Sequence, residues 1–132
     1  MASIRKEIQI DAPPEKVWDA LRDFGALHTR LVPGFVTDCR MDGEDRIVTF
    51  ANGAVMREVL IDLDDEQRRL AWSIVDGPYR HHNGVAQVIP ENGGCRFVWT
   101  ADLLADDEVV ATTDDAMGMG VGVVKKTLEV AA

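Results

Sequence analysis

The sequence is poor in features that would each point to a particular class of protein. It has two cysteines, Cys39 and Cys95, with no close-spaced partner. We expect reduced thiols in the core, with one structural disulfide as the alternative. No apolar run approaches the roughly 20 residues that a membrane-spanning helix requires. Basic residues number 14 against 23 acidic ones, and the net charge of −9 disfavours nucleic acid and anionic membranes as partners.

Targeting and catalytic signals are also missing. The start, MASIRKEIQID, is charged and lacks the apolar stretch of a secretory signal, which predicts a cytoplasmic protein. There is no glycine-rich phosphate loop and no GxSxG nucleophile elbow. We expect no cofactor. The 132 residues fit one domain, spanning 1–132, with a core large enough to be stable without metals or disulfides.

The sequence does contain regular alternation broken by turn signals. Residues 3–11 alternate apolar and polar side chains, as a half-buried strand does. A helix should follow from Pro14, ended by Gly25, and a short helical turn is expected at 27–31. Asp-Gly, Asn-Gly and similar turn sequences then separate six further predicted strands, at 35–41, 46–50, 55–63, 69–75, 79–89 and 95–104.

The last segment, 105–132, predicts one long helix. Acidic residues lie at its start and lysines near its end, which suits the helix dipole. Met117, Val121, Val124 and Leu128 share one face. The element order therefore predicts an α+β fold, in which a curled seven-stranded antiparallel sheet surrounds a long C-terminal helix.

Three glycines, Gly118, Gly120 and Gly122, alternate inside that helix, where each costs about 1 kcal/mol relative to alanine. One interpretation is that one glycine allows close packing on a strand and the others mark fraying or a kink. The other is that a loosened turn gates an apolar cavity. Met117 and Met119 would suit that second role, because their flexible side chains adapt to ligands of varied shape.

Three stretches carry a resemblance to a known superfamily: IDAPPEKVWDALRDFGALHTRLVPG, REVLIDLDDEQRRLAWSIVDGPY and GGCRFVWTADLLADD. With the element order, they resemble the START-like (SRPBCC) superfamily, whose helix-grip fold is shared by the major birch-pollen allergen family, the polyketide cyclases and the plant abscisic-acid receptors. The similarity is greatest to small bacterial polyketide cyclase/dehydratase-like and lipid-transport-like proteins. It implies a deep apolar pocket between the sheet and the C-terminal helix.

The resemblance also implies which positions face that pocket, with Glu58 as a wall residue and His82 inward on the sixth strand. The side chains expected to contact a ligand are Trp72, Ile74, Tyr79, Gly84, Ala86, Thr100, Met117 and Val121. Near Pro33 the chain lacks the lysine with which the hormone receptors hold a carboxylate. The receptors' signalling role is therefore not carried over.

Adjacent His81 and His82 suggest two kinds of chemistry. A metal site is not expected, because neighbouring strand residues point to opposite faces and no third ligand lies near in sequence. An inward His82 with a pKa near neutrality could act as a general acid or base, with Glu58 as its partner. Asp102 or Thr100 could then orient a substrate. The alternative is a structural Glu58–His82 hydrogen bond, or a place for both at the solvent rim.

A buried Glu58 needs compensation, and the candidate cations are Arg57, Arg80 and Arg96. Both faces of the strand 95–104 are partly apolar, which predicts that its outer face meets a second copy in a homodimer. The main functional prediction is binding of a small lipid-, aromatic- or polyketide-like molecule. The alternatives are a cyclase or dehydratase enzyme using His82 and Glu58, and a protein-interaction module without a small ligand.

Overall fold

The computed structural model describes residues 2–130. Within them, no helix combines the length and apolar character that a bilayer span requires. The elements, in chain order, are β1 (Ala2–Ile10), α1 (Pro14–Arg22), the 3₁₀ turn η1 (Phe24–Ala26), the π-helical turn η2 (Leu27–Leu31), β2 (Val36–Asp42), β3 (Asp45–Phe50), β4 (Val55–Asp64), β5 (Arg69–Ile74), β6 (His81–Glu91), β7 (Gly94–Leu104) and α2 (Asp107–Val130).

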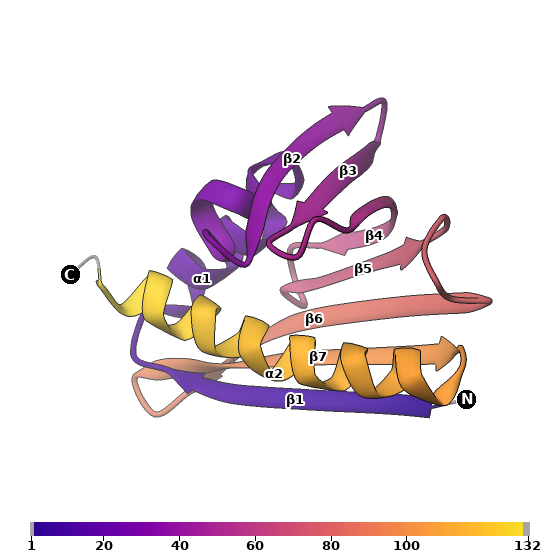
Figure 1. Cartoon of the computed structure of the whole chain (residues 1–132). Helices are drawn as coiled ribbons and strands as arrows, with labels where there is room; N and C mark the ends of the chain where they lie inside the picture. Colours follow the sequence, from indigo (N-terminus) through magenta and orange to yellow (C-terminus); the bar gives the residue numbers. More distant parts are fainter. Residues whose placement is uncertain (1, 131–132) are drawn as a thin grey trace.

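The seven strands form one antiparallel sheet in the order β1-β7-β6-β5-β4-β3-β2. Consecutive strands from β2 to β7 are neighbours, and β1 pairs with β7 along its whole length. Register shifts interrupt β2 between Val36 and Asp38 and β4 between Leu60 and Asp62. Such bulges bend a strand and increase its twist. The sheet accordingly curls, and β2 and β3 rise away from β1 and β7 (Figure 1).

The predicted α+β fold is confirmed, a curled seven-stranded sheet with a long C-terminal helix. Several boundaries differ from the prediction. The sixth strand begins at His81 rather than Tyr79, and α2 begins at Asp107 rather than Ala105. The last two residues of the predicted helix, 131 and 132, lie outside the described residues.

Helix α2 lies along β1 and β7 rather than over the middle of the sheet (Figure 1). The face predicted from the sequence is the buried one, with Met117, Val121, Val124 and Leu128 all in the core. The helix is uninterrupted from Asp107 to Val130. The three glycines therefore do not break it.

One of the three glycines has a packing reason. A Cβ atom built at Gly120 would lie 2.8 Å from Cζ3 of Trp99 on β7, closer than side-chain carbons approach one another. At Gly118 the nearest neighbour would be the end of Lys6 at 3.9 Å, and at Gly122 the space is open. The close-packing interpretation thus applies to Gly120, which brings α2 onto the Trp99 ring.

The core lies between α1, α2 and the concave face of the sheet. Alternation along β1 buries Ile4 and Ile10, while Lys6 on the same face reaches Asp114 of α2 at 2.7 Å. Cys39 and Cys95 are free and buried, as expected. Burial raises the pKa of both thiols, so they remain protonated and behave as small apolar groups.

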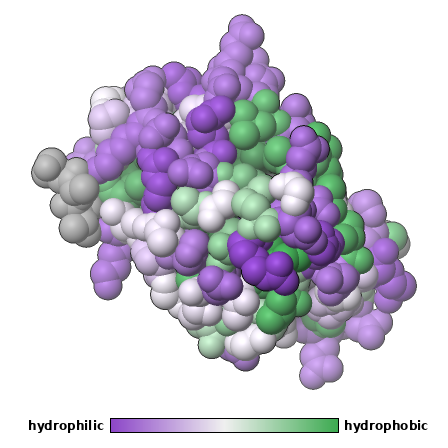
Figure 2. All heavy atoms as spheres, turned by 90° about the horizontal axis from the view of Figure 1, so that it is seen from above, coloured by the Kyte–Doolittle hydropathy of each residue, from purple (hydrophilic) through white to green (hydrophobic). Residues whose placement is uncertain are grey.

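Large exposed apolar side chains are spread over several elements. Seen from above, hydrophobic residues emerge among hydrophilic ones at the centre and right of the molecule (Figure 2). The exposed residues are Met41 on β2, Val55 and Ile61 on β4, Val75 after β5, Ile89 on β6, Leu104 on β7 and Met119 on α2.

The predicted homodimer would use the outer face of β7. The structure holds one chain, so the homodimer stays a prediction.

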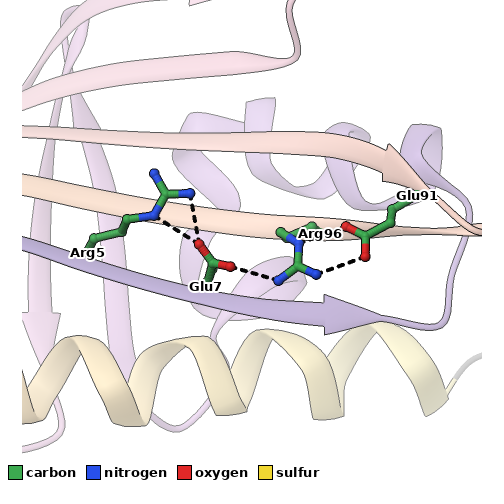
Figure 3. Close-up of polar contacts among 4 residues, drawn as sticks. All are labelled: Arg5, Glu7, Glu91 and Arg96. Carbon is green, nitrogen blue, oxygen red and sulfur yellow. Dashed lines mark hydrogen bonds and ion pairs between the residues drawn. The ribbon is translucent and has the colours of Figure 1, made fainter.

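The outer face of β1 and β7 bears a chain of ion pairs (Figure 3). Arg5 donates to Glu7 at 2.9 Å, and Arg96 donates to Glu7 at 2.8 Å and to Glu91 at 2.7 Å. These exposed pairs each contribute little to stability. They do settle the position of Arg96, which points away from the concave face and cannot be the partner of Glu58.

The two glycines give a matched test of the packing of α2. We expect Gly120→Ala to lower the free energy of unfolding by about 1–3 kcal/mol, because the added methyl group overpacks against Trp99. Gly122→Ala should raise it by up to about 1 kcal/mol, because only helix propensity changes there. Urea unfolding of both variants measures the difference. Equal stabilisation by the two substitutions would contradict a close contact at Gly120.

Candidate functional site

A cavity of about 430 Å³ lies between α2 and the β2–β7 part of the sheet. Its volume is within the range of small-molecule sites. Most of its wall is apolar, and its main apolar side chains are Leu21, Leu27, Leu31, Val32, Phe35, Val36, Phe50, Met56, Trp72, Ile74, Phe97, Trp99, Met117 and Val124. Polar residues at its border include Asn52, Thr112 and the exposed Asp115. A smaller, more open hollow around His81 and Asp102 lies on the outer surface.

The structure places most of the predicted site residues in the wall of this cavity. Glu58 and His82 line it, and so do the predicted contact residues Trp72, Ile74, Tyr79, Ala86 and Met117. They come from β4, β5, β6, α2 and the loop before β6. Met119, named as a possible adaptable neighbour, also lines the cavity but is 65% exposed.

Gly84 and Val121, by contrast, do not border the cavity. Gly84 pairs with Trp72 across β5 and β6, and a Cβ at Gly84 would lie 2.9 Å from the Trp72 ring. The space that the missing side chain leaves is thus filled by Trp72 and is not open to a ligand. Val121 packs into the core cluster and is 6% exposed.

The expectation that Thr100 faces the cavity is also wrong, and Asp102, the alternative residue for orienting a substrate, does not face it either. Phe97 and Trp99 line the cavity, so strand alternation turns Thr100 and Asp102 to the opposite face. On that outer face the Asp102 carboxylate accepts a hydrogen bond from Ser3 at 2.6 Å. Neither residue is placed to orient a molecule inside.

Glu58 has a cationic partner that the sequence analysis did not name. Arg46, directly opposite on β3, donates from Nε to Oε1 of Glu58 at 2.8 Å, and its Nη2 lies 2.7 Å from the same oxygen. Arg46 Nη1 donates to the carbonyl oxygen of Phe24 at 3.1 Å, and the guanidinium lies 3.8 Å from the Phe24 ring centre. Arg46 and Glu58 are only 3% and 4% exposed, so this is a buried ion pair.

The three proposed cations are engaged elsewhere. Arg57 pairs with Asp42 and Asp45, Arg80 with Asp106, and Arg96 with Glu7 and Glu91. All three point outward or lie beyond the strand. The expected partners of Glu58 are therefore corrected to Arg46.

His82 is 4% exposed and held in one tautomer by the backbone. The N–H of Ile74 donates to Nδ1 of His82 at 3.1 Å, so the neutral ring carries its proton on Nε2. Burial, with a smaller contribution from the nearby His81, lowers the pKa of His82 from its ordinary 6.5 to about 4. The expectation of a pKa near neutrality is therefore wrong. At pH 7 His82 is a neutral hydrogen-bond donor.

Glu58 and His82 each have one polar side-chain atom that faces the cavity without a hydrogen-bond partner among the described residues. Among the described residues, the fully enclosed side-chain atoms that lack a hydrogen bond are His28 Nδ1 and Trp99 Nε1. No described residue forms a hydrogen bond with Oε2 of Glu58 or Nε2 of His82, whose bonds are made by Oε1 and Nδ1, and neither atom is among the fully enclosed ones. Because both residues line the cavity and are buried from the outside, the space that these atoms reach is the cavity. Glu58 and His82 do not form the predicted hydrogen-bonded pair.

Tyr79 lines the cavity next to His82. Its ring centre lies 5.1 Å from that of His82, and its hydroxyl is 2.9 Å from Oγ1 of Thr113 on α2. Burial raises the pKa of Tyr79, so its hydroxyl stays protonated. This hydrogen bond connects the loop before β6 to the first half of the helix.

No group able to hold a metal ion, formed by three or more His, Cys, Asp or Glu side chains, occurs in the part of the chain that the structure describes. His81 is exposed while His82 is buried, as strand alternation requires. The chemistry available at the cavity is therefore that of a buried ion pair, a neutral imidazole and a phenol.

Comparison with known families identifies the group to which this architecture belongs. The sequence pattern of the family described as polyketide cyclase / dehydrase and lipid transport matches residues 1–129. The chain belongs to this family. The resemblance to the START-like superfamily is thereby confirmed. A search of curated proteins gave no match.

Solved structures share the fold of this cyclase and lipid-transport family member. An uncharacterised protein from Bacillus thuringiensis has a TM-score of 0.85 and 18% identity, over 96% of this chain and 98% of that one. A protein from Thermobifida fusca has a TM-score of 0.76 and 28% identity, over 96% and 89%. Norcoclaurine synthase from Thalictrum flavum, solved with dopamine and hydroxybenzaldehyde, has a TM-score of 0.72 and 20% identity, over 99% and 88%.

Two residues of the site, Trp99 and Arg46, could have been predicted from the alternation and turn signals in this chain's own sequence. Trp99 shares a face with Phe97, Ala101 and Leu103, which is the more apolar face of β7 and so the inward one. Arg46 follows from the hairpin register once its loop is known to have three residues. The lining from η2 and from Phe35 has no such signal, because neither segment alternates.

The shifted pKa of His82 predicts how stability depends on pH. The folded protein keeps His82 neutral to about pH 4, whereas the unfolded chain binds its proton near pH 6.5. The contribution of His82 is therefore complete above pH 6.5 and is lost as the pH falls towards 4. Between pH 7 and pH 5 we expect a loss of about 2 kcal/mol from this residue.

The variant His82→Asn is the control, because an asparagine oxygen can accept the Ile74 N–H without titrating. Urea unfolding at pH 7 and pH 5 should show a loss of stability about 2 kcal/mol smaller in this variant than in the unmodified protein. Parallel pH profiles of the two proteins would show that His82 is not held neutral.

Proposed function

We propose that the chain binds a small, largely apolar molecule in the cavity between the sheet and α2. The observation that carries this proposal is an internal space of about 430 Å³ with a mostly apolar wall and few polar atoms. Sites for small molecules commonly combine these properties. A protein-interaction module, the third possibility from the sequence, would have a shallow groove instead.

Two further observations support a binding role. Among the described residues, Arg46 is the one lysine or arginine that lines the cavity, and it is already paired with Glu58, so no unpaired lysine or arginine faces a ligand. The family description names polyketide cyclase / dehydrase and lipid transport, and lipids are largely apolar molecules. A ligand would contact Trp72, Ile74, Ala86 and Met117 through dispersion and the hydrophobic effect.

Filling the cavity tests the proposal. Ala116 lines the cavity, and Ala111 on the same helix is exposed and does not. We expect Ala116→Phe to weaken binding of the neutral dye Nile red at least tenfold, because the ring occupies ligand space. Ala111→Phe should leave it unchanged. Fluorescence titration measures both affinities, and native mass spectrometry of protein purified without denaturant should detect a co-purified small molecule.

Equal effects of the two phenylalanine substitutions would contradict binding inside the cavity. Failure of the unmodified protein to bind Nile red, together with a mass spectrum of the bare chain alone, would overturn the proposed function itself.

Catalysis of proton transfer is the second candidate, favoured by the two unpartnered atoms. Oε2 of Glu58 could remove a proton from the carbon next to a ligand carbonyl, and the electron pair would move onto the carbonyl oxygen. The Nε2–H of His82 could stabilise that oxygen by a hydrogen bond. The protonated Glu58 then exchanges its proton with solvent water and returns a solvent-derived proton to the carbon, which regenerates the ketone and the carboxylate. A neutral histidine suits the role of donor, although it does not suit the predicted role of general base.

This enzyme hypothesis predicts measurable exchange of carbon-bound protons. With 2-acetylnaphthalene in D₂O, the methyl protons should exchange faster in the presence of the protein, and Glu58→Gln should reduce that rate by about 10²–10⁴-fold. Proton NMR measures the exchange. If the ketone binds but exchanges no faster than with Glu58→Gln, the chain binds this ligand without catalysis.

A further inference from the structure

The charged side chains of the cavity do not favour an anionic ligand. In the part of the chain that the structure describes, Arg46 is the one lysine or arginine of the lining, and its nitrogens already contact Glu58 and the Phe24 carbonyl. The guanidinium is also stacked on the Phe24 ring at 3.8 Å. Because Glu58 already neutralises the charge of Arg46, this side chain offers an entering carboxylate or phosphate no uncompensated positive charge.

The remaining charges of the cavity are negative. Oε2 of Glu58 is open to the cavity, and Asp115 lies at its border. A carboxylate entering this space would lose its hydration, gain no free cation and approach a like charge. The net charge of −9 on the whole chain acts in the same direction over a longer range.

The hydrogen-bonding atoms of the cavity suit a different ligand. Oε2 of a carboxylate accepts hydrogen bonds only, and Nε2–H of His82 donates one. Glu58 pairs with Ile74 across β4 and β5, and Ile74 is bonded to His82 on β6. With neighbouring strands about 4.8 Å apart, the backbones of Glu58 and His82 lie roughly 10 Å from each other. An acceptor and a donor therefore lie in one row, with the Ile74 side chain between them.

We propose that the cavity selects uncharged molecules that carry a hydroxyl group and, at a distance, a carbonyl or similar acceptor, and that it excludes carboxylates. The hydroxyl donates to Oε2 of Glu58, and the carbonyl accepts from Nε2–H of His82. This inference rests on the proposed function, because it names the ligand class of the same cavity. It assigns to the Arg46–Glu58 pair the role of a charge filter.

Four naphthalenes of nearly equal size test this selectivity by competition with Nile red at pH 7. They are 6-hydroxy-2-acetylnaphthalene, 2-acetylnaphthalene, 2-naphthol and 6-hydroxy-2-naphthoate. We expect the hydroxy-ketone to bind at least tenfold tighter than the hydroxy-carboxylate. Each compound that lacks one polar group should bind about three- to tenfold more weakly than the hydroxy-ketone, the usual effect of one hydrogen bond.

Substitutions at Glu58, Asp115 and His82 show which residue causes the ligand preference. Glu58→Gln should reduce the ratio of the two dissociation constants, hydroxy-carboxylate to hydroxy-ketone, at least threefold. Asp115→Asn also removes one negative charge, but at the border of the cavity, and should leave most of that ratio unchanged. His82→Phe should weaken the hydroxy-ketone about three- to tenfold and leave 2-naphthol unchanged. Circular dichroism checks that each variant is folded. If Glu58→Gln does not fold, the ligand series on the unmodified protein still tests whether the cavity prefers the hydroxy-ketone to the carboxylate.

The outcomes separate the two proposals. If Nile red binds but the carboxylate competes as well as the hydroxy-ketone, the charge filter is wrong and the proposed function stands. If Nile red and all four naphthalenes fail to bind, the proposed function fails and the filter fails with it. If selectivity is present but unaffected by Glu58→Gln, the filter is not the ion pair and the inference is overturned.

Discussion

The structure depends on where α2 can approach the sheet. At Gly120 the helix lies directly on the Trp99 ring, and this contact holds α2 along β1 and β7. The bulged strands β2 and β4 curl away from the helix at the other side of the sheet. A straight helix seated on one edge of a curled sheet cannot fill the space under the rest of it. The cavity is the consequence, and its wall extends from β2 to β7.

A buried ion pair in the wall of such a cavity is rarely a source of stability. Removing two charges from water costs several kcal/mol each, and their attraction offsets this only with good geometry and further hydrogen bonds. Arg46 has both, through Glu58, the Phe24 carbonyl and the Phe24 ring. The arrangement leaves one oxygen of Glu58 unbonded. The Arg46–Glu58 pair therefore gives the cavity a hydrogen-bond acceptor. Two apolar side chains of the same volume would leave no polar atom there.

The fold could be predicted from the sequence because its signals are local. Alternation, turn residues and the face of α2 each depend on a few neighbouring residues, and they agreed with one another. The site was harder because it depends on contacts between strands. The resemblance implies an inward Thr100, whereas the apolar alternation of β7 turns Trp99 inward. It also implies a ligand contact at Gly84, and nothing in the sequence shows that Trp72 of the neighbouring strand covers that position.

Hairpin register decides which polar side chains meet in the cavity. The Phe50 N–H donates to the Ala54 carbonyl oxygen at 2.8 Å, so three residues, 51–53, form the turn between this pair, with Gly53 at a φ of +91°. This turn places Arg46 opposite Glu58. A two-residue loop at Asn52-Gly53 would shift the pairing by one residue and put Val59 opposite Arg46. A slip of one residue also turns a side chain to the other face of the sheet. The length of this turn therefore determines the Arg46–Glu58 ion pair, and with it the position of a free carboxylate oxygen in a largely apolar cavity.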